Sequence, residues 1–157
     1  MRYFEKISFE QFKKDISSLE NLYNEYELPK RATTNSAGYD FYAIESFTIK
    51  KGETKKIPTG YKANFMSDEA LFIFVRSSMG FKYNVRLTNQ VGVVETDYYN
   101  NPDNEGHIWV SLQNEGDKDF TVEKGKAYAQ GIFMKFLTTD DDNVSKTRLG
   151  GFGSTDK

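Results

Sequence analysis

The C-terminal residues combine groups that could bind a nucleotide. Glycines surround Phe152, Arg148 lies upstream, and Ser154 and Thr155 follow. Glycine-rich backbone approaches phosphates closely because no Cβ shields its N–H groups, and an arginine binds a phosphate through two parallel hydrogen bonds. A phenylalanine between glycines is available to stack on a base. The pattern predicts an arm over residues 138–157 that closes over a nucleotide; a merely disordered chain end is the alternative.

A second candidate phosphate site follows the apolar run at 71–75. Arg76, Ser77 and Ser78 come next, and Gly80 lies just beyond them. A guanidinium, two hydroxyls and the backbone N–H groups of this turn could all face one anion. An ordinary strand end with a polar turn would have the same residues.

Two carboxylates, Glu95 and Asp97, follow a small-residue segment that begins near Asn89. In an extended chain they share a face, because side chains alternate. A carboxylate beside a phosphate could orient and deprotonate an attacking water. Solvated acids at a strand end are the alternative.

Composition excludes several other classes of protein. Without cysteine the chain has no thiol catalysis, disulfide or cysteine-ligated zinc, and a single histidine excludes a histidine-rich metal site. The net charge of −2 gives no broad basic surface for a nucleic-acid polymer. No apolar run approaches the ~20 residues that span a bilayer, and the N-terminus lacks a signal-peptide core. We therefore expect a cytoplasmic protein with no membrane partner. His107 precedes an apolar run and is predicted to start a strand.

The N-terminal segment is predicted to be helical over 8–26. Ser8 can cap its start with Gln11 as partner, apolar residues then recur at helical spacing, and Pro29 ends the segment. We expect residues 1–28 to form a helical extension that packs on its own domain or on a neighbouring subunit.

From residue 38 the pattern changes to short apolar runs separated by turn residues. This pattern predicts an all-β domain over 29–137, a jelly-roll-like antiparallel β-sandwich or barrel with an extra N-terminal α-helix and a flexible glycine-rich C-terminal arm. The candidate strands are 39–43, 46–50, 55–65, 70–75, 85–87, 91–95, 107–113, 119–122 and 128–136.

Five segments, in this order, resemble the homotrimeric dUTP pyrophosphatase (dUTPase) family. The likeness runs from about Pro29 to Lys157, and the segments are AGYDFYA, RSSMG, GVVETDY, AQGIF and GGFGST. The resemblance implies a jelly-roll homotrimer in which each active site is assembled from three subunits. It implies hydrolysis of dUTP to dUMP and pyrophosphate, with Mg²⁺ held mainly by substrate phosphates and water rather than by the protein.

The resemblance also implies residue roles. Glu95 matches the water-activating acid, and Asp40 matches an acid that supports the metal–triphosphate region. Asn89 matches a position near the uracil, and Tyr98 matches the tyrosine that packs under the deoxyribose and rejects a ribose 2′-hydroxyl. The other matched positions contact the base or the phosphates: Arg76, Ser77, Ser78, Gly80 and Gln130 at the phosphates, Phe152 on uracil, and Arg148, Gly153, Ser154 and Thr155 in the closing arm.

The sequence departs from the family pattern in several places. The acid at the water-activating position is normally aspartate, and here it is Glu95, with Asp97 as a second candidate. Counting without a gap from the preceding segment favours Glu95. An insertion covers about 99–104, Ala127 replaces an arginine, Arg148 lies one residue closer to the glycines than is common, and the N-terminal helix is additional.

Two other functions compete with dUTP hydrolysis. A dCTP deaminase shares the fold, but that family needs a glutamate where this chain has Ser111, and it lacks the GGFGST tail. A dUTP-binding protein with weak or no turnover is the other alternative, and it rests on the departure at Glu95.

We expect Phe152→Ala to weaken catalysis by ~1–3 kcal/mol, because stacking on one base is lost. Steady-state turnover of dUTP measures this effect. A Phe152→Trp variant gives a direct readout, since a stacked indole is quenched by a non-hydrolysable dUTP analogue. Unquenched fluorescence on saturation with the analogue would contradict stacking.

Overall fold

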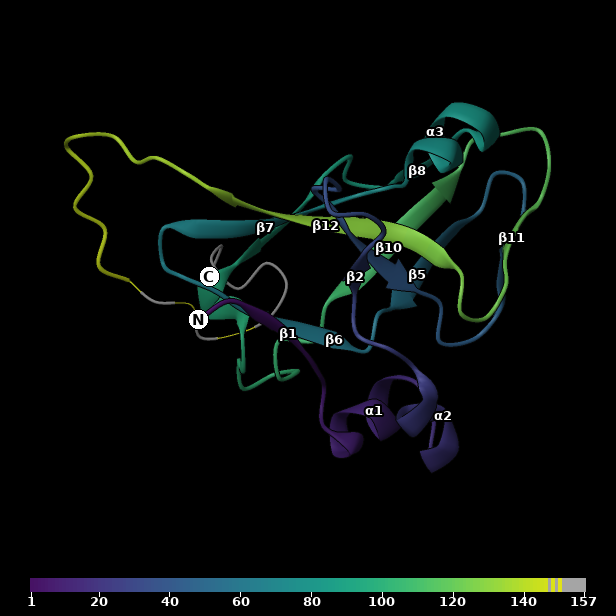
Figure 1. Ribbon diagram of the computed structural model, residues 1–157, viewed down its shortest axis with the longest axis horizontal. Helices are drawn as coiled ribbons and strands as arrows, with labels where there is room; N and C mark the ends of the chain where they lie inside the picture. Colours follow the sequence, from purple (N-terminus) through teal and green to yellow (C-terminus); the bar gives the residue numbers. More distant parts are fainter. Residues whose placement is uncertain (147, 149, 151–157) are drawn as a thin grey trace.

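The fold is mostly antiparallel β-structure, and the computed structural model describes residues 1–146, 148 and 150. Figure 1 shows the strands running along the long axis, with two short helices below them. The predicted fold class is confirmed. The strands of the described residues are β1 (Tyr3–Lys6), β2 (Lys30–Arg31), β3 (Tyr39–Tyr42), β4 (Phe47–Ile49), β5 (Thr54–Pro58), β6 (Tyr61–Asn64), β7 (Glu69–Phe74), β8 (Val85–Leu87), β9 (Gly92–Glu95), β10 (Trp109–Asn114), β11 (Phe120–Val122) and β12 (Ala127–Lys135).

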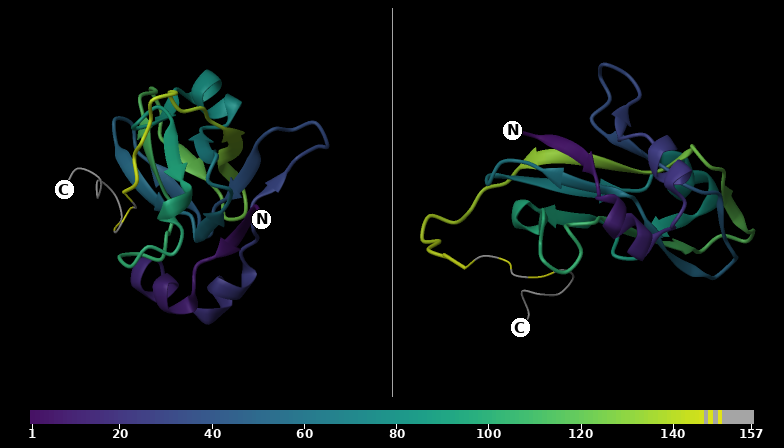
Figure 2. Two further views of the ribbon diagram at one scale, coloured as in Figure 1. Left: turned by 90° about the vertical axis from the view of Figure 1, so that its left-hand side faces the viewer. Right: turned by 90° about the horizontal axis from the view of Figure 1, so that it is seen from below.

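The largest sheet has the strand order β2-β3-β12-β7-β9. Its central strand, β12, pairs antiparallel with both β3 and β7, and Gln130 lies opposite Asp40 on one side and Phe74 on the other. A second sheet has the order β5-β10-β8, and the pairs β1-β6 and β11-β4 complete the strands. Seen along the long axis, the strands surround the core (Figure 2, left).

The core is rich in aromatic rings. Phe12, Phe41, Tyr61 and Tyr128 are fully buried. The Phe41 and Tyr61 rings meet edge to face with centroids 5.4 Å apart, a geometry that ring quadrupoles favour. The aromatic content of the sequence therefore fills the space between the sheets and beneath the N-terminal helices.

The predicted helix over 8–26 is two helices, α1 (Phe9–Asp15) and α2 (Glu20–Glu25). Ser8 caps α1 by accepting a hydrogen bond from the Gln11 N–H at 3.2 Å, as predicted. The helix breaks because the Ser17 hydroxyl accepts from the Leu19 N–H at 3.1 Å. A serine that bonds to nearby backbone competes with helix continuation.

Two strands at the start of the chain were not predicted. β1 pairs with β6 over four residues, and the two-residue β2 pairs with β3. Both are short, and short runs give a weak periodic signal. β1 attaches the first residues to the β-domain, and α1 follows it below the strands in Figure 1. No helix among the described residues is long and apolar enough to cross a membrane.

The predicted strand over 55–65 is interrupted at Gly60, which has φ +79°. A Cβ here would lie 2.8 Å from the Tyr26 ring, so only glycine fits this bend. The Gly60 carbonyl accepts hydrogen bonds from the Ile7 N–H at 3.0 Å and the Tyr26 hydroxyl at 2.8 Å. The bend therefore joins the N-terminal segment to the sheet.

His107 precedes β10 and is completely buried between the sheet and α1. Its Nε2 accepts from the Gly60 N–H at 2.9 Å, and its Nδ1 lies 2.6 Å from the Asp15 carboxylate. This pairing fixes the neutral ring with its proton on Nδ1. Burial lowers the pKa of His107, against the opposing effect of Asp15 and Glu105.

We expect the free energy of unfolding to fall as the pH drops from 7 to 5. A lowered pKa means that the unfolded chain binds the proton first, so the loss begins near the ordinary value of about 6.5 and ends below the folded-state pKa. A tenfold difference in proton affinity between the folded and unfolded chain changes this free energy by about 1.4 kcal/mol. Urea unfolding of the wild type and of His107→Asn at each pH measures the loss, and equal pH slopes over this range would contradict it.

Candidate active site

One pocket contains five of the predicted site residues. It has a volume of about 420 Å³, and its lining includes Asp40, Arg76, Ser77, Ser78 and Gln130. The residues come from β3, from the start of α3 (Ser77–Tyr83) and from β12. The register of the large sheet explains the grouping, because Gln130 lies directly opposite Asp40.

Arg76 supplies the positive charge of this pocket, and it is paired with Asp40. Arg76 Nε lies 3.2 Å from Asp40 Oδ1, and the arginine side chain is 43% exposed while the aspartate is 14% exposed. A largely buried carboxylate thus fixes a guanidinium at the pocket mouth. This arrangement leaves Arg76 oriented for bidentate contact with a phosphate.

Arg76 is also the residue that precedes α3, and no side chain caps this helix start among the described contacts. The first N–H groups of a helix have no acceptor within the helix. Ser77 and Ser78 line the pocket beside the guanidinium. Their hydroxyls and the uncapped N–H groups of this helix start are therefore available to an anion. Gly80 lies within α3 and is not among the residues that line the pocket, and a Cβ there would make ordinary contacts at 3.8 Å.

Gln130 occupies a tightly defined position in the pocket wall. Its Nε2 donates to the Val75 carbonyl at 3.1 Å. A Cβ on Gly38 would lie only 2.2 Å from its Oε1, a distance that no real Cβ contact shows. The glycine of the AGYDFYA segment therefore makes room for this amide.

The predicted acids lie at a different place. Glu95 ends β9 and Asp97 lies in the turn η1 (Thr96–Tyr98). Their side chains are 55% and 41% exposed, and Arg148 forms ion pairs with both, at 3.2 Å from its Nε to Asp97 Oδ1. The arm leaves β12 and curves back toward this turn (Figure 1). Arg148 is thus beside the acids and is not among the residues that line the pocket of Asp40 and Arg76.

Strand β7 sets the distance between Glu95 and the pocket that contains Gln130. Ala70 of β7 pairs with Glu95, whereas Phe74 pairs with Gln130. Four residues of a strand extend roughly 13 Å, and the pocket lies beyond Phe74. Within one chain, Glu95 is therefore remote from the pocket that contains Arg76.

Tyr98 and Asn89 are separate from the pocket too. Asn89 is exposed in the turn between β8 and β9. The Tyr98 ring is only 7% exposed, its hydroxyl donates to the His107 carbonyl at 2.7 Å, and it accepts from Asn104 Nδ2 at 2.8 Å. Burial raises the pKa of Tyr98, so its hydroxyl stays protonated. Phe152, Gly153, Ser154 and Thr155 lie outside the described residues.

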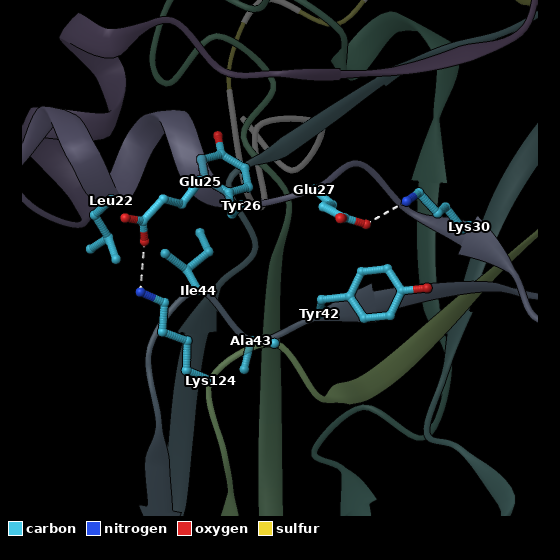
Figure 3. A pocket seen from close by; sticks show the side chains of 10 residues that line it. Leu22, Glu25, Tyr26, Glu27, Lys30, Tyr42, Ala43, Ile44 and Lys124 are labelled. Carbon is cyan, nitrogen blue, oxygen red and sulfur yellow. Dashed lines mark hydrogen bonds and ion pairs between the residues drawn. The ribbon is translucent and has the colours of Figure 1, made fainter.

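A second pocket, of about 370 Å³, contains none of the predicted site residues. Figure 3 shows it between α2 and β3, with an ion pair at either side. Glu25 binds Lys124 at 2.8 Å, and Glu27 binds Lys30. The cations of the lining that the structure describes are both lysines, so this lining has no guanidinium for bidentate contact with a phosphate.

Known proteins share both the sequence pattern and the fold. A family model described as dUTPase matches residues 24–156. A deoxyuridine 5′-triphosphate nucleotidohydrolase of Lactococcus lactis is 49% identical over 130 residues, which are 82% of this chain and 87% of that protein. The chain belongs to the dUTPase family. The Haemophilus influenzae dUTPase is 38% identical over 143 residues, 85% of this chain and 90% of that protein.

Solved dUTPase structures have the same architecture. The crystal structure of the Streptococcus mutans dUTPase has a TM-score of 0.70 at 42% identity and covers 87% of this chain and 98% of that one. The EIAV dUTPase has a TM-score of 0.65 at 18% identity and covers 93% of this chain and 98% of that one. At this identity the likeness supports the fold alone. The predicted family is confirmed.

The pocket residues fit Mg²⁺, which the dUTPase resemblance implies, only as a partner of the substrate. Among the described residues, no three His, Asp or Glu side chains lie together as metal ligands. Asp40 is the acid that lines the pocket, and it is paired with Arg76. The donors present suit phosphate oxygens better than a bare cation, so they fit a metal that arrives bound to a triphosphate.

We expect Gly38→Ala to displace Gln130 and to lower affinity for a non-hydrolysable dUTP analogue by about 10-fold or more, because one charge-assisted hydrogen bond is worth ~1.5–3 kcal/mol. Isothermal titration calorimetry measures this change. Gly125→Asn is the matched control, since a Cβ there meets no atom within 4 Å and asparagine tolerates its positive φ. Equal affinity in Gly38→Ala and wild type would contradict the role of Gln130.

Proposed function

We propose that this chain hydrolyses dUTP to dUMP and pyrophosphate by attack of water on the α-phosphorus. The observation that carries the proposal is the pocket that gathers Asp40, Arg76, Ser77, Ser78 and Gln130 in a dUTPase-family chain. Curated relatives are named for this reaction. The sheet register and the start of α3 support an anion site at the point where these segments meet.

Arg76, Ser77 and Ser78 bind the phosphate chain, and Asp40 holds the guanidinium in position. Positioned cations and hydroxyls stabilise the charge that spreads over the phosphate oxygens in phosphoryl transfer. Mg²⁺ bound to the triphosphate supplies further neutralisation of the negative charge. Because Asp40 already compensates the single positive charge of Arg76, the guanidinium acts chiefly through directed hydrogen bonds.

Glu95 accepts the proton of the attacking water. Its side chain is half-exposed at the end of β9, and a carboxylate within reach of a water is a competent general base. Within one chain, roughly 13 Å of strand β7 lies between Glu95 and the pocket. The Glu95 of one copy therefore serves the pocket of another copy. This separation supports the homotrimer with shared sites.

Closure of the arm requires Arg148 to change partners. It now contacts Glu95 and Asp97, and in the closed site it contacts the β- and γ-phosphates with Ser154 and Thr155. Release of Arg148 also frees the Glu95 carboxylate to contact the attacking water, because the guanidinium no longer occupies its oxygen. Substrate entry and activation of the base are thereby coupled.

A dUTP-binding protein with weak turnover is the second candidate. The specific observation in its favour is that Arg148 pairs with both possible bases. The deaminase alternative has no such support, since Ser111 Oγ lies 2.7 Å from Thr88 Oγ1 in a hydroxyl pair. Release of pyrophosphate, and not of ammonia, from the deoxynucleotide distinguishes these possibilities.

We expect Glu95→Gln to lower kcat for dUTP by ~10²–10⁴-fold, the usual contribution of a general base, and to leave binding of a non-hydrolysable analogue intact. Asp97→Asn is the matched control and keeps most activity. Pyrophosphate release with Mg²⁺ measures both. The opposite order, with Asp97→Asn inactive and Glu95→Gln active, would assign the base to Asp97. Wild type that binds dUTP without turnover would favour the second candidate.

A further inference from the structure

The Tyr98 hydroxyl makes hydrogen bonds to two groups. It donates to the His107 carbonyl at 2.7 Å and accepts from Asn104 Nδ2 at 2.8 Å. Asn104 is itself fixed, because its Oδ1 accepts from Asn101 Nδ2 at 2.8 Å. A phenol with both its donor and its acceptor used in this way has a fixed ring position.

His107 connects this anchor to the N-terminal helix. The buried imidazole bridges the Asp15 carboxylate at 2.6 Å and the Gly60 N–H at 2.9 Å. Asp15 is oriented in turn by Gln11, whose Nε2 donates to Asp15 Oδ2 at 2.8 Å. A continuous series of hydrogen bonds therefore runs from the last turn of α1 to the backbone that holds Tyr98.

The loop that follows Tyr98 is bound to the start of the same helix. The Glu105 carboxylate accepts from the Ser8 N–H at 2.7 Å and from the Ser8 hydroxyl at 2.6 Å. Lys62, which is 9% exposed, donates to Glu105 at 2.9 Å and to Asn100 Oδ1 at 2.7 Å. The two additions to the family pattern, the helix and the insertion at 99–104, thus pack together.

We infer that α1 and the loop at 99–105 form one support that fixes the Tyr98 ring, and that this support sets the selectivity for a deoxyribose over a ribose. Asp15, His107 and Asn104 are positioning residues in this account. The inference rests on the proposed function, and on the deoxyribose contact that the family resemblance implies for Tyr98, and deepens them.

The physical reason is the stiffness of the ring. A ring rejects a 2′-hydroxyl sterically only if it does not yield, since a movable ring accommodates the extra oxygen at small cost. Tyr98 is 7% exposed, so little of its surface remains for a ligand, and a small displacement changes the space available there. The two hydrogen bonds of the Tyr98 hydroxyl therefore affect the preference for deoxyribose over ribose more than they affect the affinity for dUTP.

The test compares sugar selectivity in two variants from opposite ends of the support. Asn104→Asp keeps Oδ1 and removes the donor to Tyr98, and Asp15→Asn removes the charge that holds His107. Glu25→Gln, which breaks an exposed ion pair of α2, is the matched control. Calorimetry with non-hydrolysable analogues of dUTP and UTP gives the ratio of affinities, and steady-state kinetics gives kcat and KM for dUTP.

We expect both support variants to lower the preference for the deoxy analogue by about 10-fold, with kcat for dUTP within about 3-fold of wild type and Glu25→Gln unchanged. Tyr98→Phe should lose selectivity to a similar extent, because it keeps the ring and loses the anchor. A purely structural role would lower the thermal unfolding temperature without changing the ratio.

Unchanged selectivity in folded Asn104→Asp and Asp15→Asn would overturn the inference while leaving dUTP hydrolysis intact. Unchanged selectivity in Tyr98→Ala would remove the role of Tyr98 and the support with it. Because the ratio is measured by binding, it decides the inference even if wild type does not turn over dUTP. A wild type that binds neither analogue would overturn both proposals.

Discussion

The pairing register of β12 is the constraint on which the site depends. With Gln130 opposite both Asp40 and Phe74, the amide, the acid and the start of α3 all meet at one end of the large sheet. A slip of one residue would turn Gln130 to the other face, because side chains alternate. Close packing fixes the register: a Cβ on Gly131 would lie 3.0 Å from Leu71 and 3.2 Å from Phe41. The same two contacts that fill the core thus decide where the phosphate donors lie.

The sheet also separates the groups that the chemistry needs together. Glu95 pairs with the start of β7 and the phosphate pocket follows its end. A strand does not fold back on itself, so no side-chain rotation closes this gap. Strand geometry therefore supports the proposed sharing of sites between copies independently of sequence similarity. The exposed acids at the end of β9 pair within one chain with Arg148, the same guanidinium that contacts the phosphates in the proposed closed site.

Much of the fold could be predicted from short-range patterns. Alternation and turn residues identified most strands within one or two residues, and the Ser8 cap gave the start of α1. The break after Asp15 was missed because apolar spacing continues through Ser17, whose side-chain bond ends the helix. Arg76, Ser77 and Ser78 could be grouped from the turn that they share, whereas Asp40 and Gln130 could be added only by resemblance. The support of Tyr98 could not be found at all. His107 and Asp15 are 92 positions apart, and no local period links them. The assigned roles of Phe152 and its neighbours stay predictions.

That long separation has a consequence for biosynthesis. Helix α1 has seven residues, too few to be stable alone in water, and the histidine partner of its carboxylate is made 92 residues later. The Asp15 carboxylate therefore lacks its histidine partner until the chain has been made as far as β10. The N-terminal helix is thus stabilised by long-range contacts rather than by its own helix propensity.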